Sequence, residues 1–260
     1  MTEQASSDML LSTKALSRSF GGLKAVHDVN FTLRRGEVRA LIGPNGAGKT
    51  TFVGMLVGRI APSAGSIQFD GSDVTGMAVH DRIREGMAYT FQITSIFSKL
   101  SVHENVALAA RRRLPNDLTA ADQAVATALA QVGLDDRTDQ MAGDLSYGHQ
   151  RLLEVAMGIV QKPKLLILDE PTQGLADREI EDFKAIIARV NESATILLIE
   201  HNMAVVMAIA DRVTVLNFGE VLAEGTPQDI RENAAVQEAY LGTKASAPTN
   251  TGSTTQEGLT

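Results

Sequence analysis

Two hydrophobic patterns alternate along this chain and together predict an α/β fold. Residues 164–168 and 194–199 are near-continuous apolar runs, as expected for strands buried on both faces of a parallel sheet. Between them, residues 177–191 repeat apolar side chains at helical spacing, which predicts a helix with one buried face. Buried strands that alternate with amphipathic helices are typical of a parallel sheet covered by helices.

In the first part of the chain, apolar residues recur at the shorter spacing that is typical of strands. Residues 9–42 alternate roughly between apolar and polar positions and predict strands, broken by a turn at 34–37. Short strands are expected at 66–69 and 86–91, and a hairpin around Gly219 later in the chain. We therefore expect an antiparallel β subdomain beside the main sheet.

The middle of the chain is helical. Ser101 and Glu104 have capping-box spacing and predict a helix start, and further helices are expected at 119–132 and 146–161. This block suggests a helical lobe, about residues 93–162, inserted into the α/β core. Both ends of the chain, 1–9 and 243–260, are rich in small polar residues and are expected to be disordered.

Composition narrows the possible functions. The 260 residues can bury one substantial core, and the absence of cysteine excludes disulfides, thiolate zinc sites and thiol catalysis. A net charge of −7 makes the chain a poor candidate for binding nucleic acid. Its apolar runs are no longer than strands, and its first residues do not form a signal peptide. We expect a protein of the cytosol or of the cytosolic side of a membrane.

One short stretch carries most of the chemical information. It has the pattern G-x-x-x-x-G-K-[ST], in which glycines let backbone N–H groups converge on phosphate, the lysine neutralises it and a hydroxyl suits Mg²⁺. An expected strand precedes this loop and an expected helix follows it, so a chance glycine-rich turn is the weaker interpretation. The predicted phosphate-binding residues are Gly43, Pro44, Asn45, Gly46, Ala47, Gly48, Lys49, Thr50 and Thr51. A nucleoside triphosphate, ATP, is the expected ligand.

Two carboxylates follow the apolar strand at 164–168. At a strand end beside the phosphate loop, Asp169 is placed to hold Mg²⁺ together with Thr50. Glu170 would then face the γ-phosphate, where a carboxylate can orient and deprotonate water. The alternative is a solvated acidic pair with no role in catalysis.

Read in order, four further segments complete a recognisable set: Gln92, Leu145-Ser146-Tyr147-Gly148-His149-Gln150, Gly174-Leu175-Ala176-Asp177 and His201. With the phosphate loop, they resemble the ATP-binding subunits of ABC transporters over residues 10–242. The resemblance implies a P-loop, RecA-like core with an antiparallel β subdomain and an inserted helical lobe. It also implies that two ATP molecules lie between two head-to-tail ATPase subunits.

The resemblance assigns roles to single residues. Ser146 and Gly148, at a helix N-terminus, would bind the γ-phosphate held by the other subunit. Gln92 would contact Mg²⁺ and the attacking water, and His201 the γ-phosphate. Phe20 would stack on adenine, and Asp177 joins the nucleotide-contacting set.

The signature segment departs from the usual Leu-Ser-Gly-Gly-Gln at two positions. Tyr147 and His149 replace its third and fifth residues, whereas the phosphate-facing Ser146 and Gly148 are kept. Binding to the second nucleotide should therefore survive. His149 suggests that ATPase turnover depends on pH.

Within the family, the chain resembles the ATPases of branched-chain amino-acid importers. The residues that carry this resemblance are 19–26, 90–92, 145–148 and 239–242. It implies a second ATPase subunit, like or unlike, two transmembrane permease subunits and, indirectly, a periplasmic solute-binding protein. It also implies a peripheral position on the cytoplasmic face of the inner membrane.

Two other functions remain open from the sequence. The ATPase of a lipopolysaccharide exporter shares the general motifs and a Tyr-Leu-Gly ending, although residues 21–24 favour the importer. A soluble ABC ATPase of translation or DNA repair is disfavoured, because the chain has one cassette, no heptads and no cysteine.

Overall fold

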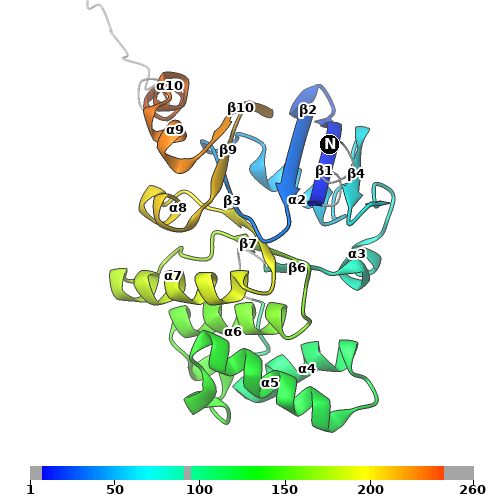
Figure 1. Cartoon of the computed structure of the whole chain (residues 1–260), viewed down its shortest axis with the longest axis vertical. Coiled ribbons are helices and arrows are strands. Elements are labelled where there is room, and N and C mark those ends of the chain that lie inside the picture. Colours follow the sequence, from blue (N-terminus) through cyan, green and yellow to red (C-terminus); the bar gives the residue numbers. More distant parts are fainter. Residues whose placement is uncertain (1–7, 91–94, 243–260) are drawn as a thin grey trace, which may run out of the picture.

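Two sheets and a group of helices make up the structure, a computed structural model that describes residues 8–90 and 95–242 (Figure 1). The smaller sheet has the order β2-β1-β4-β5 and is antiparallel. Its strands are β1 (Met9–Phe20), β2 (Leu23–Arg34), β4 (Ala64–Phe69) and β5 (Ser72–Asp73). The predicted antiparallel subdomain is therefore confirmed.

The larger sheet has the order β10-β9-β3-β8-β7-β6. Its strands are β3 (Val38–Ile42), β6 (Met87–Thr90), β7 (Leu165–Asp169), β8 (Thr195–Ile199), β9 (Arg212–Asn217) and β10 (Glu220–Gly225). All neighbours are parallel except the β9–β10 hairpin. Every residue of β3, β7 and β8 is buried, which explains their nearly unbroken apolar sequences.

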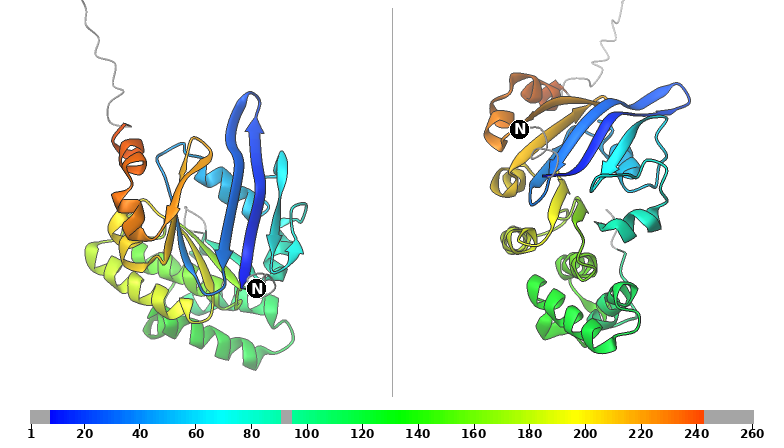
Figure 2. Two further views of the ribbon diagram at one scale, coloured as in Figure 1. Left: turned by 45° about the horizontal axis from the view of Figure 1, so that its top comes forward. Right: turned by 45° about the vertical axis from the view of Figure 1, so that its right-hand side comes forward.

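The helices divide between the sheet and a lobe. They are α2 (Lys49–Leu56), α3 (Val79–Glu85), α4 (Val102–Arg113), α5 (Leu118–Val132), α6 (Tyr147–Ile159), α7 (Asp177–Asn191), α8 (Met203–Ile209), α9 (Pro227–Glu232) and α10 (Ala234–Gly242). In the right-hand view of Figure 2, α4 and α5 lie at the opposite end of the molecule from β1 and β2. Helices α6 and α7 lie between them and the sheet (Figure 1).

Separate hydrophobic cores hold these layers together. One packs α4, α5, α6 and α7 against one face of the larger sheet. A second packs α2 and the smaller sheet against the other face, and a third joins α8, α9 and α10 to β3 and β9. Polar contacts add to this packing: Asp70, at the β4–β5 turn, accepts hydrogen bonds from Arg35 and Lys164.

Most expected elements are present, but helix α10 and the two-residue strand β5 were not expected. The pattern analysis missed the short helices α3 and α8, whereas α4, with its capping box between Ser101 and Glu104, begins where expected. Of the end predicted to be disordered, only Asp8 and Met9 are described, and Met9 already begins β1. The other predicted end, 243–260, and Gln92 lie outside the described residues. Across the described part of the chain, no helix combines the length and apolar character needed to cross a bilayer.

Candidate nucleotide-binding site

The phosphate loop connects β3 to α2, as its flanking patterns predict. Two of its glycines are required because a side chain would not fit there and because their backbone φ angles are positive. Gly43 and Gly48 have φ values of +151° and +99°, and a Cβ on them would lie 2.1 Å from Leu216 O and 2.4 Å from Ala25 O. Contacts this short do not occur for real side chains, so the loop passes this close to its neighbours only with glycine.

A cavity of about 570 Å³ opens over this loop. Its lining is Phe20, Leu23, Lys24, Ala25, Asn45, Gly46, Ala47, Gly48, Lys49, Thr50, Thr51, Asp169, Glu170, Ile199 and Phe218. The structure thus brings together most of the loop, the carboxylate pair and the aromatic residue singled out from the sequence. Gly43 and Pro44 lie just behind this lining, where their carbonyl oxygens accept hydrogen bonds from Lys49 Nζ at 2.6 and 3.1 Å.

Lys49 is the cation of the phosphate loop, and Lys24 also lines the cavity. Burial lowers the pKa of the Lys49 ammonium, and the neighbouring charges of Glu170 and Asp169 oppose that shift. Burial therefore favours the neutral amine of Lys49, whereas the two carboxylates favour its charged form. A bound polyphosphate would add negative charge beside it and favour its protonated form further.

Asp169 ends β7 inside the cavity, and Tyr89 holds it in place. The Tyr89 hydroxyl donates a 2.7 Å hydrogen bond to Asp169 Oδ2. Burial raises the pKa of Asp169; the Tyr89 hydrogen bond opposes this shift and the charge of Glu170 adds to it. Burial and the bond to Asp169 also raise the pKa of Tyr89. The sequence analysis missed Tyr89, because its partner lies 80 positions away on the next strand.

Glu170 and His201 lie close to each other, just after the carboxyl ends of β7 and β8. Glu170 has a left-handed backbone, with φ of +48°, and its N–H donates to Ile199 O. Its Oε1 lies 3.8 Å from Nδ1 of His201, so the two side chains approach without a direct hydrogen bond. His201 is 57% exposed, which leaves its ring accessible from solvent.

Glu200 fixes the loop that carries His201, and the sequence analysis missed this role as well. Its buried carboxylate accepts hydrogen bonds from the backbone N–H groups of His201, Asn202 and Thr172. The Thr172 hydroxyl donates to it too. This carboxylate therefore joins the segment after β8 to the segment after β7, the two segments that carry His201 and Glu170.

The signature residues lie elsewhere. Ser146 caps α6 and Asp177 is the first residue of α7, and neither they nor Gly148 line the cavity over the phosphate loop. A Cβ on Gly148 would lie 2.4 Å from Oε1 of Glu179, so the starts of α6 and α7 meet closely here and a larger residue would displace the Glu179 side chain. Ser146 Oγ lies 2.8 Å from Nδ1 of His149, so the unusual histidine contacts the predicted phosphate ligand.

Aromatic rings flank the mouth of the cavity. Phe20 is 45% exposed, and its ring lies under the guanidinium of Arg18 at 4.6 Å. Phe218, at the β9–β10 turn, is 86% exposed and lines the same cavity. The sequence analysis singled out only Phe20, since a lone aromatic in a hairpin turn carries no recognisable motif.

Comparison with known proteins supports this arrangement. The family model described as "ABC transporter" matches residues 26–173, and the model described as "Branched-chain amino acid ATP-binding cassette transporter" matches residues 220–246. The chain is 41% identical over 253 residues to the high-affinity branched-chain amino acid transport ATP-binding protein LivG of Escherichia coli, covering 91% of this chain and 99% of that protein. It is 39% identical over 249 residues to the corresponding protein BraF of Pseudomonas aeruginosa, covering 90% and 98%.

A more distant relative represents the exporter alternative. The lipopolysaccharide export system ATP-binding protein LptB of Escherichia coli is 34% identical over 235 residues, covering 89% of this chain and 97% of that protein. Among solved structures, the ADP conformation of an ATP-binding cassette of an ABC transporter superposes with a TM-score of 0.80 at 25% identity, covering 90% of this chain and 99% of that one. The fold, the lining of the cavity over the phosphate loop and these similar proteins all point to the same protein family.

Proposed function

Because this chain belongs to the ABC transporter ATP-binding family, whose members hydrolyse ATP to drive transport, we propose that it powers an importer of branched-chain amino acids or related small polar solutes. The observation that carries the importer assignment is the match of its C-terminal residues, 220–246, to the branched-chain model. The higher identity to LivG and BraF than to LptB supports it. The lipopolysaccharide-type exporter is the second candidate, because LptB also matches nearly the whole chain.

Mg²⁺ fits the donor groups of the cavity. The Thr50 hydroxyl and the Asp169 carboxylate line one cavity, and hard oxygen donors of this kind suit Mg²⁺ bound together with substrate phosphates. Gln92, the third expected contact, lies outside the described residues. When bound, the ion would neutralise charge on the phosphates.

The side chains of the cavity support a division of work in hydrolysis. Lys49 and the loop N–H groups would hold the terminal phosphates, while Phe20 would stack against adenine. Glu170, next to Asp169, would accept the proton of the attacking water, and His201 would contact the γ-phosphate from the side of Glu170. The strained backbone of Glu170 fits this role, since such conformations concentrate at functional sites.

The separation of the two phosphate-binding segments supports a composite site. Ser146 and the Gly148 backbone stand at the start of α6, a natural anion site, yet they do not line the cavity that holds Lys49. We therefore propose that a second ATPase subunit, like or unlike this one, presents its Ser146 equivalent to this cavity, with Asp177 near the same junction. ATP would then join the subunits and hydrolysis would separate them.

The remaining partners follow from the same proposal. Two transmembrane permease subunits would receive the motion, with a periplasmic solute-binding protein delivering the solute, and the chain would lie on the cytoplasmic face of the inner membrane. Phe97 is a candidate contact for a permease helix, because it is 55% exposed at the edge of the lobe. Its neighbour Ile96 packs against the lobe core instead.

The proposal is tested by uptake of radiolabelled leucine in cells that lack the chromosomal copy of this gene. Plasmid-borne wild-type protein should restore uptake, and Glu170→Gln should not, because the proton acceptor is lost while ATP binding is kept. Glu181→Gln removes an exposed carboxylate on α7 and serves as the control that should behave as wild type. Normal leucine uptake without the gene, together with a loss of lipopolysaccharide from the outer surface, would favour the exporter.

A further inference from the structure

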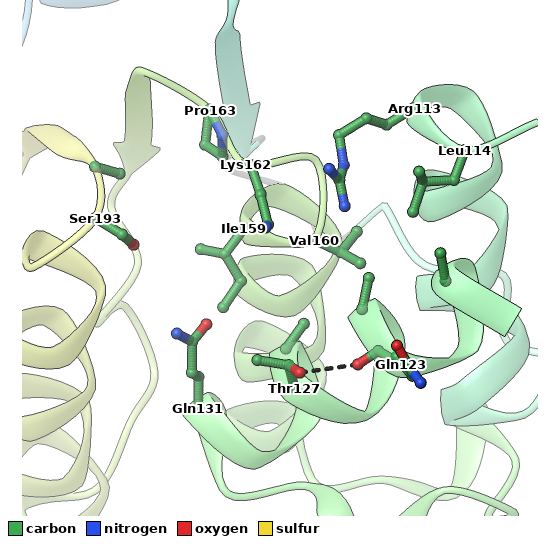
Figure 3. Close-up of a pocket in the computed structure, with 14 residues that line it drawn as sticks. Arg113, Leu114, Gln123, Thr127, Gln131, Ile159, Val160, Lys162, Pro163 and Ser193 are labelled. Carbon is green, nitrogen blue, oxygen red and sulfur yellow. Dashed lines mark hydrogen bonds between the residues drawn. The ribbon is translucent and has the colours of Figure 1, made fainter. Parts of the chain in front are cut away.

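A second cavity, of about 690 Å³, lies where the helical lobe meets the sheet (Figure 3). It shares no lining residue with the cavity over the phosphate loop. One side is formed by α5 and the end of α4, and the other by α6 and by the segments that enter β7 and β8. A molecule bound there would touch both the lobe and the core.

The charges of this cavity are all of one sign. Arg113 and Lys162 are among its fourteen lining residues, none of which is Asp or Glu, although the chain as a whole carries a charge of −7. Figure 3 shows both side chains pointing into the same space above α5. Two cations that converge without a carboxylate create a positive potential and attract an anion.

Within the described residues, no ion pair or side-chain hydrogen bond of Arg113 or Lys162 is found, and both residues are exposed to solvent. Arg112, the preceding residue, behaves differently, since it donates to Gln161 Oε1 and to His80 O. Lys162 also has a left-handed backbone, with φ of +50°, at a position where glycine or asparagine would be more usual. Lys162 therefore adopts its backbone conformation at an energetic cost.

The rest of the lining is mainly apolar. Ile159, Val160, Leu114 and Pro163 lie around the two cations together with several alanines. The Thr127 hydroxyl already donates to Gln123 O at 2.8 Å, so it offers no free proton (Figure 3). A multiply charged, fully polar anion would leave this apolar surface unused, whereas an anion with an aliphatic body would cover it.

We propose that this cavity binds a small organic acid whose carboxylate lies between Arg113 and Lys162 and whose aliphatic chain packs on Ile159 and Val160. A guanidinium and an ammonium suit one carboxylate, the first through paired N–H groups and the second as a point charge. The volume is that of an ordinary small-molecule site. Since the site spans lobe and core, occupancy holds the two parts together and raises the stability of the whole chain.

The test uses the full-length protein with octanoate as the probe and isothermal titration as the readout. Octanoate should bind, and the uncharged octanamide should bind about tenfold or more weakly, because it lacks the charge that both cations recognise. Arg113→Gln and Lys162→Asn should each weaken octanoate binding by a similar factor. Arg111→Gln, which removes an equal charge outside the lining, should leave the affinity unchanged.

The position of the probe is checked by methyl NMR. The Ile159 methyl signals should shift on addition of octanoate, while those of Ile67, in the core that packs α2 and the smaller sheet, should not. The proposal is overturned if octanoate fails to bind at about 10 mM, or if octanamide matches it. It is also overturned if Arg113→Gln binds as wild type, or if inorganic phosphate competes as well as octanoate does.

Discussion

Replacing Gly48 by alanine tests whether the phosphate loop depends on close backbone contact. The new Cβ would lie 2.4 Å from Ala25 O and 3.3 Å from Gly219 Cα. Since real contacts below 3.0 Å are essentially absent, the loop and β2 would have to separate by at least about 0.6 Å. Both atoms it meets belong to the backbone, so no side-chain rotation relieves the contact.

Gly71→Ala is the matched control. Gly71 also has a left-handed backbone, with φ of +80°, but a Cβ there meets nothing within 4 Å. Both variants therefore carry the left-handed strain of alanine, about 1–2 kcal/mol, and the same change in unfolded-chain entropy. Only Gly48→Ala adds the overpacking cost, about 1–3 kcal/mol.

These costs convert into thermal shifts. At about 2–4 °C per kcal/mol for a chain of this size, Gly71→Ala should lower the melting temperature by about 4 °C and Gly48→Ala by about 10 °C. Gly48→Ala should also lose ATP affinity, because Ala25 and the loop both line the nucleotide cavity. Differential scanning calorimetry and titration with a fluorescent ATP analogue measure the two effects. Equal melting temperatures for the two variants would refute the argument from close contact.

Three further predictions concern single polar contacts. Tyr89→Phe should weaken Mg²⁺-dependent ATP hydrolysis about tenfold by removing the hydrogen bond that orients Asp169; an unchanged Mg²⁺ titration of activity would contradict it. Asp70→Asn should destabilise the protein at neutral pH but not in strong acid. Its two cationic partners lower the pKa of Asp70. The stabilisation that Asp70 provides is therefore present above the unfolded-state pKa, about 3.9, and is lost as pH falls through the folded-state value. Equal losses in the free energy of unfolding at both pH values, measured by urea unfolding, would exclude this. His149→Gln should change the rate of ATP hydrolysis, because it removes the ring nitrogen that lies 2.8 Å from Ser146 Oγ, the predicted phosphate ligand; an unchanged rate would contradict a role of His149 through Ser146.

The elements that sequence pattern predicts well are those with a strong local signal. The unbroken apolar residues of β7, the amphipathic face of α7 and the glycine-rich loop before α2 each follow from a few neighbouring positions. Helix α8 was missed because its seven residues are too few to display a period, although Asn202 caps it through two backbone N–H groups.

The parts of the site that were missed depend on contacts between distant segments. The bond between Tyr89 and Asp169 exists because β6 and β7 are parallel neighbours, which is a property of the sheet order. Glu200 reads as an ordinary acidic residue, yet it is buried and bound by two loops. The motifs predict which residues perform the chemistry, whereas the residues that position them emerge only from the packed sheet.

The central claim is that the cavity over the phosphate loop is half of a site, completed by the Ser146 segment of a second subunit. Sedimentation of purified Glu170→Gln protein with Mg²⁺ and ATP tests it directly, beside Glu170→Gln carrying the additional change Ser146→Arg. The single variant should sediment as a dimer. The double variant should remain a monomer that still binds ATP, because Ser146 does not line its own cavity. A double variant that dimerises equally well, or a wild-type monomer that hydrolyses ATP at a rate per subunit independent of concentration, would contradict the account.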